Sequence, residues 1–328
     1  MRNHPFLYCG RKLLWFLASV FLLSVAVFYI SRLAPGDPLM SYYGERVEKM
    51  SVEEKEAARE KLGLNAPIHT QYVRWLEHAA MGDFGISFKY KQDVLVVIGD
   101  RIGFTLILGG VGFVLTFVGA LFLGILCAWH EGRWIDRSLC WGGTLLSCIP
   151  EFWLALVLIL IFAVRLHWLP SSGAYDVGCM HDVLNRMEHL ILPLVIVVLQ
   201  HLWYDAYMIR NKLLEETRAD YVLLGKSKGL SKCQIMFRHC LPSIMPSYIS
   251  LMAVSVPHML GGTYIVETVF SYPGIGQLAY ESARYHDYNL LMVLCMMTGI
   301  LIILCNLIAQ LINEKIDPRI KASEVTVG

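Results

Sequence analysis

The chain has 328 residues, of which 56% are hydrophobic and 17% are charged, and its mean hydropathy is +0.51. Soluble domains carry roughly 25% charged residues, so this composition excludes an ordinary soluble domain and indicates a membrane protein. The formal net charge of +1 gives no support for a nucleic-acid partner or an acidic substrate. Any information in the charges therefore lies in their distribution along the chain.

Six stretches are nearly free of charged residues and are long enough to cross ~30 Å of hydrocarbon, which takes about 20 helical residues. They are residues 13–31, 102–129, 138–164, 189–209, 241–266 and 288–313. Glu151 interrupts the third and Asp205 the fourth. The first is too long for a signal peptide and lacks a good cleavage site, so we expect it to be retained. The sequence predicts an all-α integral membrane protein with six transmembrane helices.

Basic residues occur in alternate segments between these stretches, which is the pattern of cytoplasmic loops. They are Arg2, Arg11 and Lys12, then Arg133 and Arg137, then Arg210, Lys212, Arg218, Lys226, Lys228, Lys232 and Arg238, and finally Lys315, Arg319 and Lys321. The intervening segments near 166–188 and 267–287 are poor in Lys and Arg and richer in Asp and Glu. Both termini are therefore predicted to be cytoplasmic.

This topology predicts a domain organisation. Residues 1–31 form the N-terminal cytoplasmic end and first transmembrane helix, 32–101 an extracytoplasmic helical segment, 102–313 a five-helix core and 314–328 a cytoplasmic tail. The core includes a cytoplasmic loop at 209–240.

The outer segment 32–101 carries two helix signals. Ser51 and Glu54 have the spacing of a capping box, and Gly63 is a stop signal for the helix that follows the box. Pro67 opens a second amphipathic pattern that ends at Gly82. We therefore expect a small helical segment on the outer face.

The nine cysteines do not indicate a disulfide framework or a metal site. Only Cys179 is clearly external in this topology, no C-x-x-C is present, and no Cys/His cluster has zinc spacing. Small buried side chains are the simpler interpretation.

Pro150 and Glu151 interrupt the third apolar stretch. Proline removes a helical hydrogen bond and kinks the helix, and an intramembrane carboxylate is costly unless it faces protein, water or a ligand. Glu151 is therefore a translocation-path candidate, the alternative being a carboxylate in a water-filled vestibule without substrate contact. Asp205 and Arg210 are expected to mark the inner end of the fourth helix without a functional role.

Enzyme motifs are suggested but incomplete. Gly225-Lys226-Ser227 matches the end of a P-loop, yet the first glycine of that motif is replaced by Asp220. "DFG" at 83–85 lacks the other kinase motifs. His201 and His258 lie in apolar stretches without a serine nucleophile motif nearby, so helix packing is the better account. We predict that the chain is not an enzyme and binds no cofactor or metal.

The loop 209–240 contains two helical patterns separated by Lys228 and Gly229. The first pattern places Leu213, Leu214, Thr217, Tyr221 and Leu224 at helical spacing. A helix, a glycine turn and another helix suit docking into a groove of a partner protein, but a basic amphipathic helix on the membrane surface fits equally well.

This loop resembles the coupling loop of ABC-importer permeases. Leu241-Pro242 follows Gly229 at the spacing of that family, and Asp220-Tyr221-Val222 and Lys228-Gly229-Leu230-Ser231 match the peptide-transporter branch. The loop departs from the family's E-A-A positions, where it has Leu223, Leu224 and Gly225, and from its Ile position, where it has His239.

Other stretches extend the resemblance to the dipeptide, oligopeptide and nickel permeases over nearly the whole chain. They are "RLAPGDP" (32–38), "GDFGISF" (82–88), "IPEFWLALVLI" (149–159), "LPSSG" (169–173), "HLILP" (189–193), "GGTYIVETVFSYPGIGQL" (261–278) and "CNLIAQLINEKIDPRI" (305–320). Departures include Gln310 and "HDYN" (286–289).

The resemblance implies a type I ABC-importer permease fold in a bacterial inner membrane, with import of di- or oligopeptides as the function. Nickel or metal-chelate import is the alternative, and a stand-alone channel or secondary carrier is a more distant one. The implied partners are a second homologous permease, two cytoplasmic ATPases that bind ATP and Mg²⁺, an external solute-binding protein and membrane lipid, without nucleic acid.

The same resemblance implies two groups of functional residues. Those for coupling to the ATPases are Asp220, Tyr221, Leu224, Lys228, Gly229, Leu230, Leu241 and Pro242. Those for the outer gate or the binding-protein contact are Phe270, Tyr272, Pro273, Gly274 and Gly276.

Overall fold

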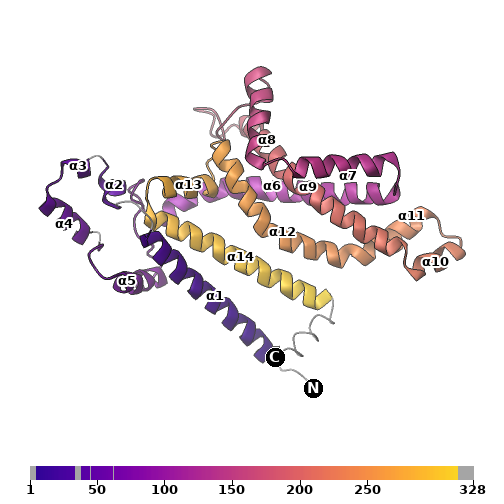
Figure 1. Cartoon of the computed structure of the whole chain (residues 1–328), viewed down its shortest axis with the longest axis horizontal. Helices are drawn as coiled ribbons and strands as arrows, with labels where there is room; N and C mark the ends of the chain where they lie inside the picture. Colours follow the sequence, from indigo (N-terminus) through magenta and orange to yellow (C-terminus); the bar gives the residue numbers. More distant parts are fainter. Residues whose placement is uncertain (1–4, 34–37, 45, 62, 317–328) are drawn as a thin grey trace. The chain divides into compact units, whose positions relative to one another are not determined.

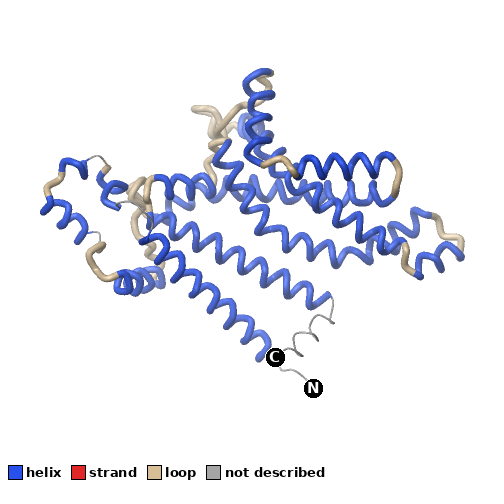
Figure 2. The backbone as a smooth tube through the Cα atoms, viewed as in Figure 1, coloured by secondary structure: helices blue, strands red, loops and turns tan. Residues whose placement is uncertain are grey.

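The structure is a computed structural model that describes residues 5–33, 38–44, 46–61 and 63–316. The described residues are almost entirely helical, and Figure 2 shows helices joined by loops. Their only β feature is an isolated antiparallel bridge between Ile86 and Asp93. The predicted all-α class is confirmed. "RLAPGDP" and the predicted tail lie mostly outside the described residues, as do Arg2, Arg319 and Lys321.

Within the described part of the chain, five helices are long and apolar enough to cross a membrane. They are α1 (Pro5–Leu33), α6 (Val94–Trp129), α9 (Val183–Thr217), α12 (Leu241–Val269) with the turns before it, and α14 (Tyr288–Ile316). A sixth span exists if α7 (Trp134–Ser147) and the helix that begins at Glu151 are counted together. This agrees with the six predicted crossings.

The third span is much more sharply interrupted than the predicted kink. The axis turns by 99° between α7 and α8 (Glu151–Leu158), which continues as the π-helical segment Ile159–Arg165. The break lies at Cys148–Pro150, where proline has no N–H to donate to the preceding turn. The predicted interruption at Pro150 and Glu151 is confirmed, but it divides the stretch 138–164 into two helices instead of kinking one.

The chain forms two compact units. One combines Met1–Phe104 with Pro273–Leu304, and the other combines Thr105–Tyr272 with Cys305–Gly328. Each unit joins segments that are distant in sequence. The domain boundaries proposed from the sequence remain predictions.

In the first unit, α1 lies beside α14 (Figure 1). Phe28 of α1, Tyr72 of α5 (Ile68–Ala80) and Met292 of α14 form a buried cluster. The hydroxyls of Ser24 and Tyr72 are 2.8 Å apart, which satisfies two polar groups within this apolar packing. Helix α5 is thus fixed against the first transmembrane helix.

The remaining outer helices are α2 (Pro38–Tyr43), α3 (Arg46–Lys49) and α4 (Val52–Lys61). The predicted capping box is confirmed, because the backbone amide of Ser51 donates to Glu54 at 2.8 Å and that of Glu54 donates to Ser51 at 3.1 Å. Gly63, with φ +70°, follows α4, and Gly82, with φ +82°, follows α5. Left-handed backbone at these positions favours glycine and ends both helices.

In the second unit, α9 packs against α7, α8 and α12. The fourth helix continues to Thr217, well beyond the predicted end at 209. Apolarity limits the membrane-spanning part, but residues 211–217 contain no helix breaker and the helix continues beyond the apolar stretch. The prediction that Asp205 and Arg210 mark the helix end was therefore wrong.

The predicted first helix of the cytoplasmic loop is also divided. Its early positions belong to α9, whereas Tyr221 and Leu224 belong to α10 (Asp220–Ser227), with a break at Arg218 and Ala219. The second helix begins as α11 (Lys232–Ile235), passes through the π-helical segment Met236–Cys240 and continues into α12.

Candidate functional site

The loop between α9 and α12 is a compact helix–turn–helix. Gly229 has φ +79°, and its amide donates to the carbonyl of Lys226 at 3.0 Å. Ser231 then caps α11 through a capping box with Gln234, with bonds of 2.9 and 3.2 Å. The left-handed turn and the cap specify where α10 ends and α11 begins.

One side of the loop is packed and the other is open. Gly225 is buried, and a Cβ there would lie 3.4 Å from Leu230 and 3.6 Å from Ile235. In contrast, Leu223 and Leu224 are 62% and 56% exposed. The family's E-A-A positions therefore provide both the packing contact and an uncovered apolar surface in this chain.

The other residues predicted for coupling lie around the same loop. Asp220 and Lys228 are exposed at the two ends of α10, and Pro242 is in the first turn of α12 directly after Leu241. Burial, followed by a hydrogen bond to Glu216, raises the pKa of Tyr221 and keeps its hydroxyl protonated. The coupling role of these residues stays a prediction.

Two contacts attach the loop to the turn between α6 and α7. Arg218 pairs with Glu131 at 2.6 Å, and Lys232 Nζ donates to the carbonyl of Trp129 at 2.5 Å. These contacts lie on either side of α10. Movement of the loop would therefore also pull on the turn between α6 and α7 through these two contacts.

Glu151 lies at the first position of α8, directly after the 99° bend. Its Oε1 atom is buried and has no hydrogen-bond partner among the described residues. Gln200 on α9 donates to the carbonyl of Ile149 at 3.3 Å and holds the bend against α9. The proline break thus places a carboxylate inside the packing of three helices.

Gly262 on α12 provides the space for this carboxylate. A Cβ at Gly262 would lie 3.1 Å from His201 Nε2 and 3.3 Å from Glu151 Oε1. Sequence reasoning singled out Glu151 but assigned His201 to packing alone. The apolar pattern identifies the helices but cannot show that these two side chains meet at one glycine.

Asp205 lies one turn beyond His201 on α9 and is only 2% exposed. Ser255 of α12 donates to it at 3.4 Å. Asp205 is therefore a buried acid between two helices. In the sequence, the feature that singled it out was a charged residue within an apolar stretch. Glu267, also buried, accepts a hydrogen bond of 2.6 Å from Thr105 and was not identified from the sequence.

The residues predicted for the outer gate are divided between the two units. Phe270 and Tyr272 are 1% and 3% exposed in the second unit. Burial raises the pKa of Tyr272 to about 12. Pro273, Gly274 and Gly276 belong to the first unit, where Gly274 precedes α13 (Ile275–Arg284). Their proposed role remains a prediction.

A polar network in the first unit holds the loop that contains "GDFGISF". Asp287 accepts from Ser87 Oγ at 2.5 Å and from the amide of Lys89 at 3.0 Å. Glu281 of α13 pairs with Lys89 at 2.5 Å. Sequence reasoning noted "HDYN" only as a departure and missed this anchoring role of its Asp287.

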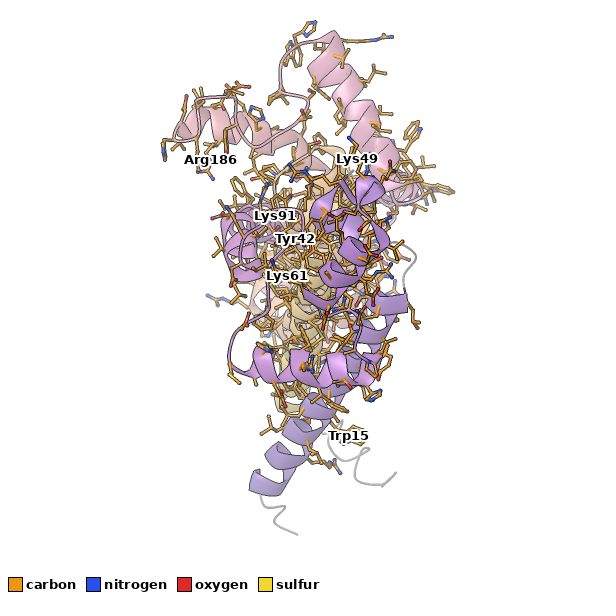
Figure 3. The ribbon with its side chains drawn as sticks, turned by 90° about the vertical axis from the view of Figure 1, so that its left-hand side faces the viewer. Trp15, Tyr42, Lys49, Lys61, Lys91 and Arg186 are labelled. Atoms are coloured by element: carbon orange, nitrogen blue, oxygen red, sulfur yellow. The ribbon has the colours of Figure 1, made fainter. Side chains whose placement is uncertain are left out.

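Tyr42 of α2 is attached to the same loop. The Lys91 ammonium lies 3.5 Å from the centroid of the Tyr42 ring and donates to the Tyr42 carbonyl. Figure 3 shows these two residues as neighbours in the outer segment. The loop, α2 and α13 therefore form a connected outer surface.

Among the described residues, no group of three or more His, Cys, Asp or Glu side chains is arranged to hold a metal ion. The apolar helices, the broken third span and the structured loop between α9 and α12 define a multi-pass helical membrane protein.

Comparisons with known proteins give the family. Residues 120–322 match the model of the binding-protein-dependent transport system inner membrane component, and residues 6–109 match its N-terminal model. The chain belongs to this family and is a multi-pass permease of the inner membrane.

Relatives match over almost their whole length. The oligopeptide transport system permease protein AppB of Bacillus subtilis is 30% identical over 315 residues, covering 96% of this chain and 99% of the relative. The probable peptide ABC transporter permease protein y4tP of Sinorhizobium fredii is 31% identical over 314 residues, with the same coverage.

The fold also matches a solved structure, an inward-facing MetNI methionine ABC transporter, with a TM-score of 0.55 and 18% identity. The match covers 68% of this chain and 97% of that one. This likeness confirms the predicted type I importer fold.

Proposed function

We propose that this chain is one of two permease subunits of an ATP-driven importer for di- or oligopeptides. The observation that carries the proposal is its similarity to permeases named for peptide transport over 96% of its length. The uncovered apolar surface of α10 supports it independently, because such a surface suits docking in a partner's groove.

The proposed assembly contains a second homologous permease, two cytoplasmic ATPases and an external solute-binding protein. ATP and Mg²⁺ are bound by the ATPases, since Asp220 occupies the position where a P-loop requires its first glycine. The distribution of Lys and Arg supports cytoplasmic termini. α10 and the ATPases then lie on the same side of the membrane.

Coupling would proceed from α10 into the membrane. Tyr221 and Leu224 present the docking surface, and Gly229 provides the turn. Residues Lys232–Val269 form a continuous helical path from the loop into the membrane. A displacement of the loop when the ATPases close would therefore move α12 and change access to the translocation path.

The test is reconstitution of the complete transporter in proteoliposomes with a labelled peptide retained by its binding protein. Uptake should require ATP, both ATPases and the binding protein. Uptake by this chain alone would contradict the proposal and favour a channel or carrier. A nickel chelate in place of the peptide tests the alternative cargo.

Coupling itself is tested with Gly229→Pro, which cannot adopt the left-handed turn. We expect this variant to lose transport while the subunits still co-purify. Full transport by this variant would contradict the coupling role of Gly229.

A further inference from the structure

A carboxylate and an imidazole meet at one glycine within the packing of α8, α9 and α12. The position of a Cβ on Gly262 is 3.3 and 3.5 Å from the two carboxylate oxygens of Glu151 and 3.1 Å from His201 Nε2. Both side chains therefore lie against the backbone of α12. A larger residue at Gly262 would displace them.

The parts of α8, α9 and α12 around this negatively charged site contain no Lys or Arg. No Lys or Arg occurs in residues 151–158, 187–209 or 241–269. Glu151 Oε1 is buried without a hydrogen-bond partner among the described residues. A carboxylate taken out of water without a partner is costly, so a cation that binds there would gain an unusually strong interaction.

A second acid continues the site along the same helices. Asp205 follows His201 by four residues, which places both on one face of α9. Its partner Ser255 precedes His258 by three residues on α12. Glu151 and Asp205 therefore occupy two successive positions along the contact between α9 and α12. The imidazoles of His201 and His258 lie at the position of Glu151.

The position occupied by Glu151, His201 and His258 borders accessible space. His258 is exposed, and a Cβ at Gly261 would meet no atom within 4 Å. Glu151 and His201 themselves are only partly exposed. A ligand group could therefore approach along the open side of α12 and reach the buried oxygen of Glu151.

We propose that Glu151, with His201 beside it, binds a cationic group of the cargo during its passage, and that Asp205 provides the next acidic position. The chemistry is that of an ammonium group donating to a carboxylate, as the N-terminus of a peptide would, or of a cationic metal chelate. This inference rests on the proposed import function and adds a cargo-binding site within the membrane.

The experiment compares Glu151→Gln with wild type in the complete reconstituted transporter. The amide keeps the size of the side chain but removes its charge. We expect the rate of peptide uptake to fall about 10- to 100-fold, the effect of losing a charged hydrogen bond. ATP hydrolysis stimulated by the binding protein should persist, because the coupling loop is unchanged.

Two further variants and one further measurement sharpen the result. Glu188→Gln makes the same chemical change at an exposed position of α9 and should leave uptake unchanged. Glu151→Asp retains the charge and should restore part of the uptake. The melting temperature of Glu151→Gln should equal or exceed that of wild type, because a carboxylate without a partner is removed.

The outcomes are distinguishable. Wild-type uptake without ATP or without ATPases would contradict the proposed function itself. Wild-type import that Glu151→Gln leaves unchanged would overturn the binding site alone, as would a lowered melting temperature of the variant with proportional loss of all activities. Parallel assays with a free-amino dipeptide and a cationic 1:1 nickel–histidine chelate identify which cation uses the site.

Discussion

The guanidinium of Arg210 donates to both carboxylate oxygens of Asp136, at 2.6 Å from Nε and 2.7 Å from Nη2. The amide of Gly132 adds a third bond to Asp136, at 3.0 Å. These contacts join the start of α7 to the C-terminal half of α9. They hold α9 against α7 at Arg210, shortly before α9 continues toward the proposed coupling loop.

Asp136→Asn should destabilise the protein strongly. The Asp136 and Arg210 side chains are 3% and 18% exposed, so the change leaves a largely buried guanidinium without its counter-ion. Loss of one partner of a buried pair costs roughly 3–5 kcal/mol. Thermal unfolding of the purified protein measures this effect.

The matched control for that variant is Glu131→Gln. Its pair with Arg218 has the two side chains 44% and 71% exposed, and exposed pairs contribute less than about 1 kcal/mol. Equal losses of stability in the two variants would contradict the structural importance of the Asp136–Arg210 pair.

Gly262→Ala and Gly261→Ala should differ in transport although they are adjacent. A methyl group at Gly262 would crowd His201 and Glu151 at 3.1 and 3.3 Å, whereas one at Gly261 would meet nothing within 4 Å. Alanine favours helix by up to about 1 kcal/mol over glycine, so both variants should remain folded. Peptide uptake should fall severalfold only in Gly262→Ala, and similar uptake by both would contradict the described geometry.

Gly229→Ala should weaken coupling through backbone conformation alone. Gly229 has φ +79° and open space around its Cα, so the penalty is the roughly 1–2 kcal/mol of a left-handed residue with a side chain. We expect less uptake for each ATP hydrolysed, with partial recovery in Gly229→Asn, because asparagine tolerates this conformation.

The outer Gly63 supplies the control for this prediction. It has φ +70° and equally open surroundings, so Gly63→Ala carries the same conformational penalty away from the coupling loop. Its ratio of uptake to ATP hydrolysis should match that of wild type. An identical change of this ratio in both variants would show that general destabilisation, rather than coupling, is being measured.

The outer loop should loosen in acid. Burial opposes ionisation of Glu281, but hydrogen bonds from Lys89 and Tyr90 outweigh it and hold its pKa below the ordinary 4.5. A depressed carboxylate pKa stabilises the folded state above the ordinary value, and this stabilisation is lost as pH falls through the depressed pKa. Backbone amides of residues 86–91 should therefore show increasing opening below about pH 4.5.

Hydrogen exchange followed by mass spectrometry, corrected for the intrinsic pH dependence, measures this opening. Glu281→Gln should already be loosened at neutral pH and should lose the acid-dependent step. Glu77→Gln, at an exposed position of α5, should retain it. Persistence of the step in Glu281→Gln would assign it to another group.

Local signals in the sequence predicted much of this architecture. The apolar stretches predicted the spans, the spacing of Ser51 and Glu54 predicted a capping box that is present, and Gly229 was placed at a turn that the structure contains. These features depend on hydropathy, on a spacing of three residues, or on the conformational freedom of one glycine. Each can be evaluated without knowledge of distant residues.

Predictions failed where a boundary depended on more than apolarity. Apolarity ends near residue 209, but the helical propensity of the following residues carries α9 to Thr217. Pro150 indicated an interruption, but its 99° angle depends on how α7 and α8 pack against α9. Hydropathy measures neither effect.

The sequence by itself determined that this is a helical multi-pass membrane protein, since composition, apolar length and basic loops are properties of the chain alone. Only the tertiary structure brought Glu151 and His201 to Gly262, and Asp136 to Arg210. Such contacts depend on which faces of distant helices pack together. Helical periodicity defines each face but does not specify its partner.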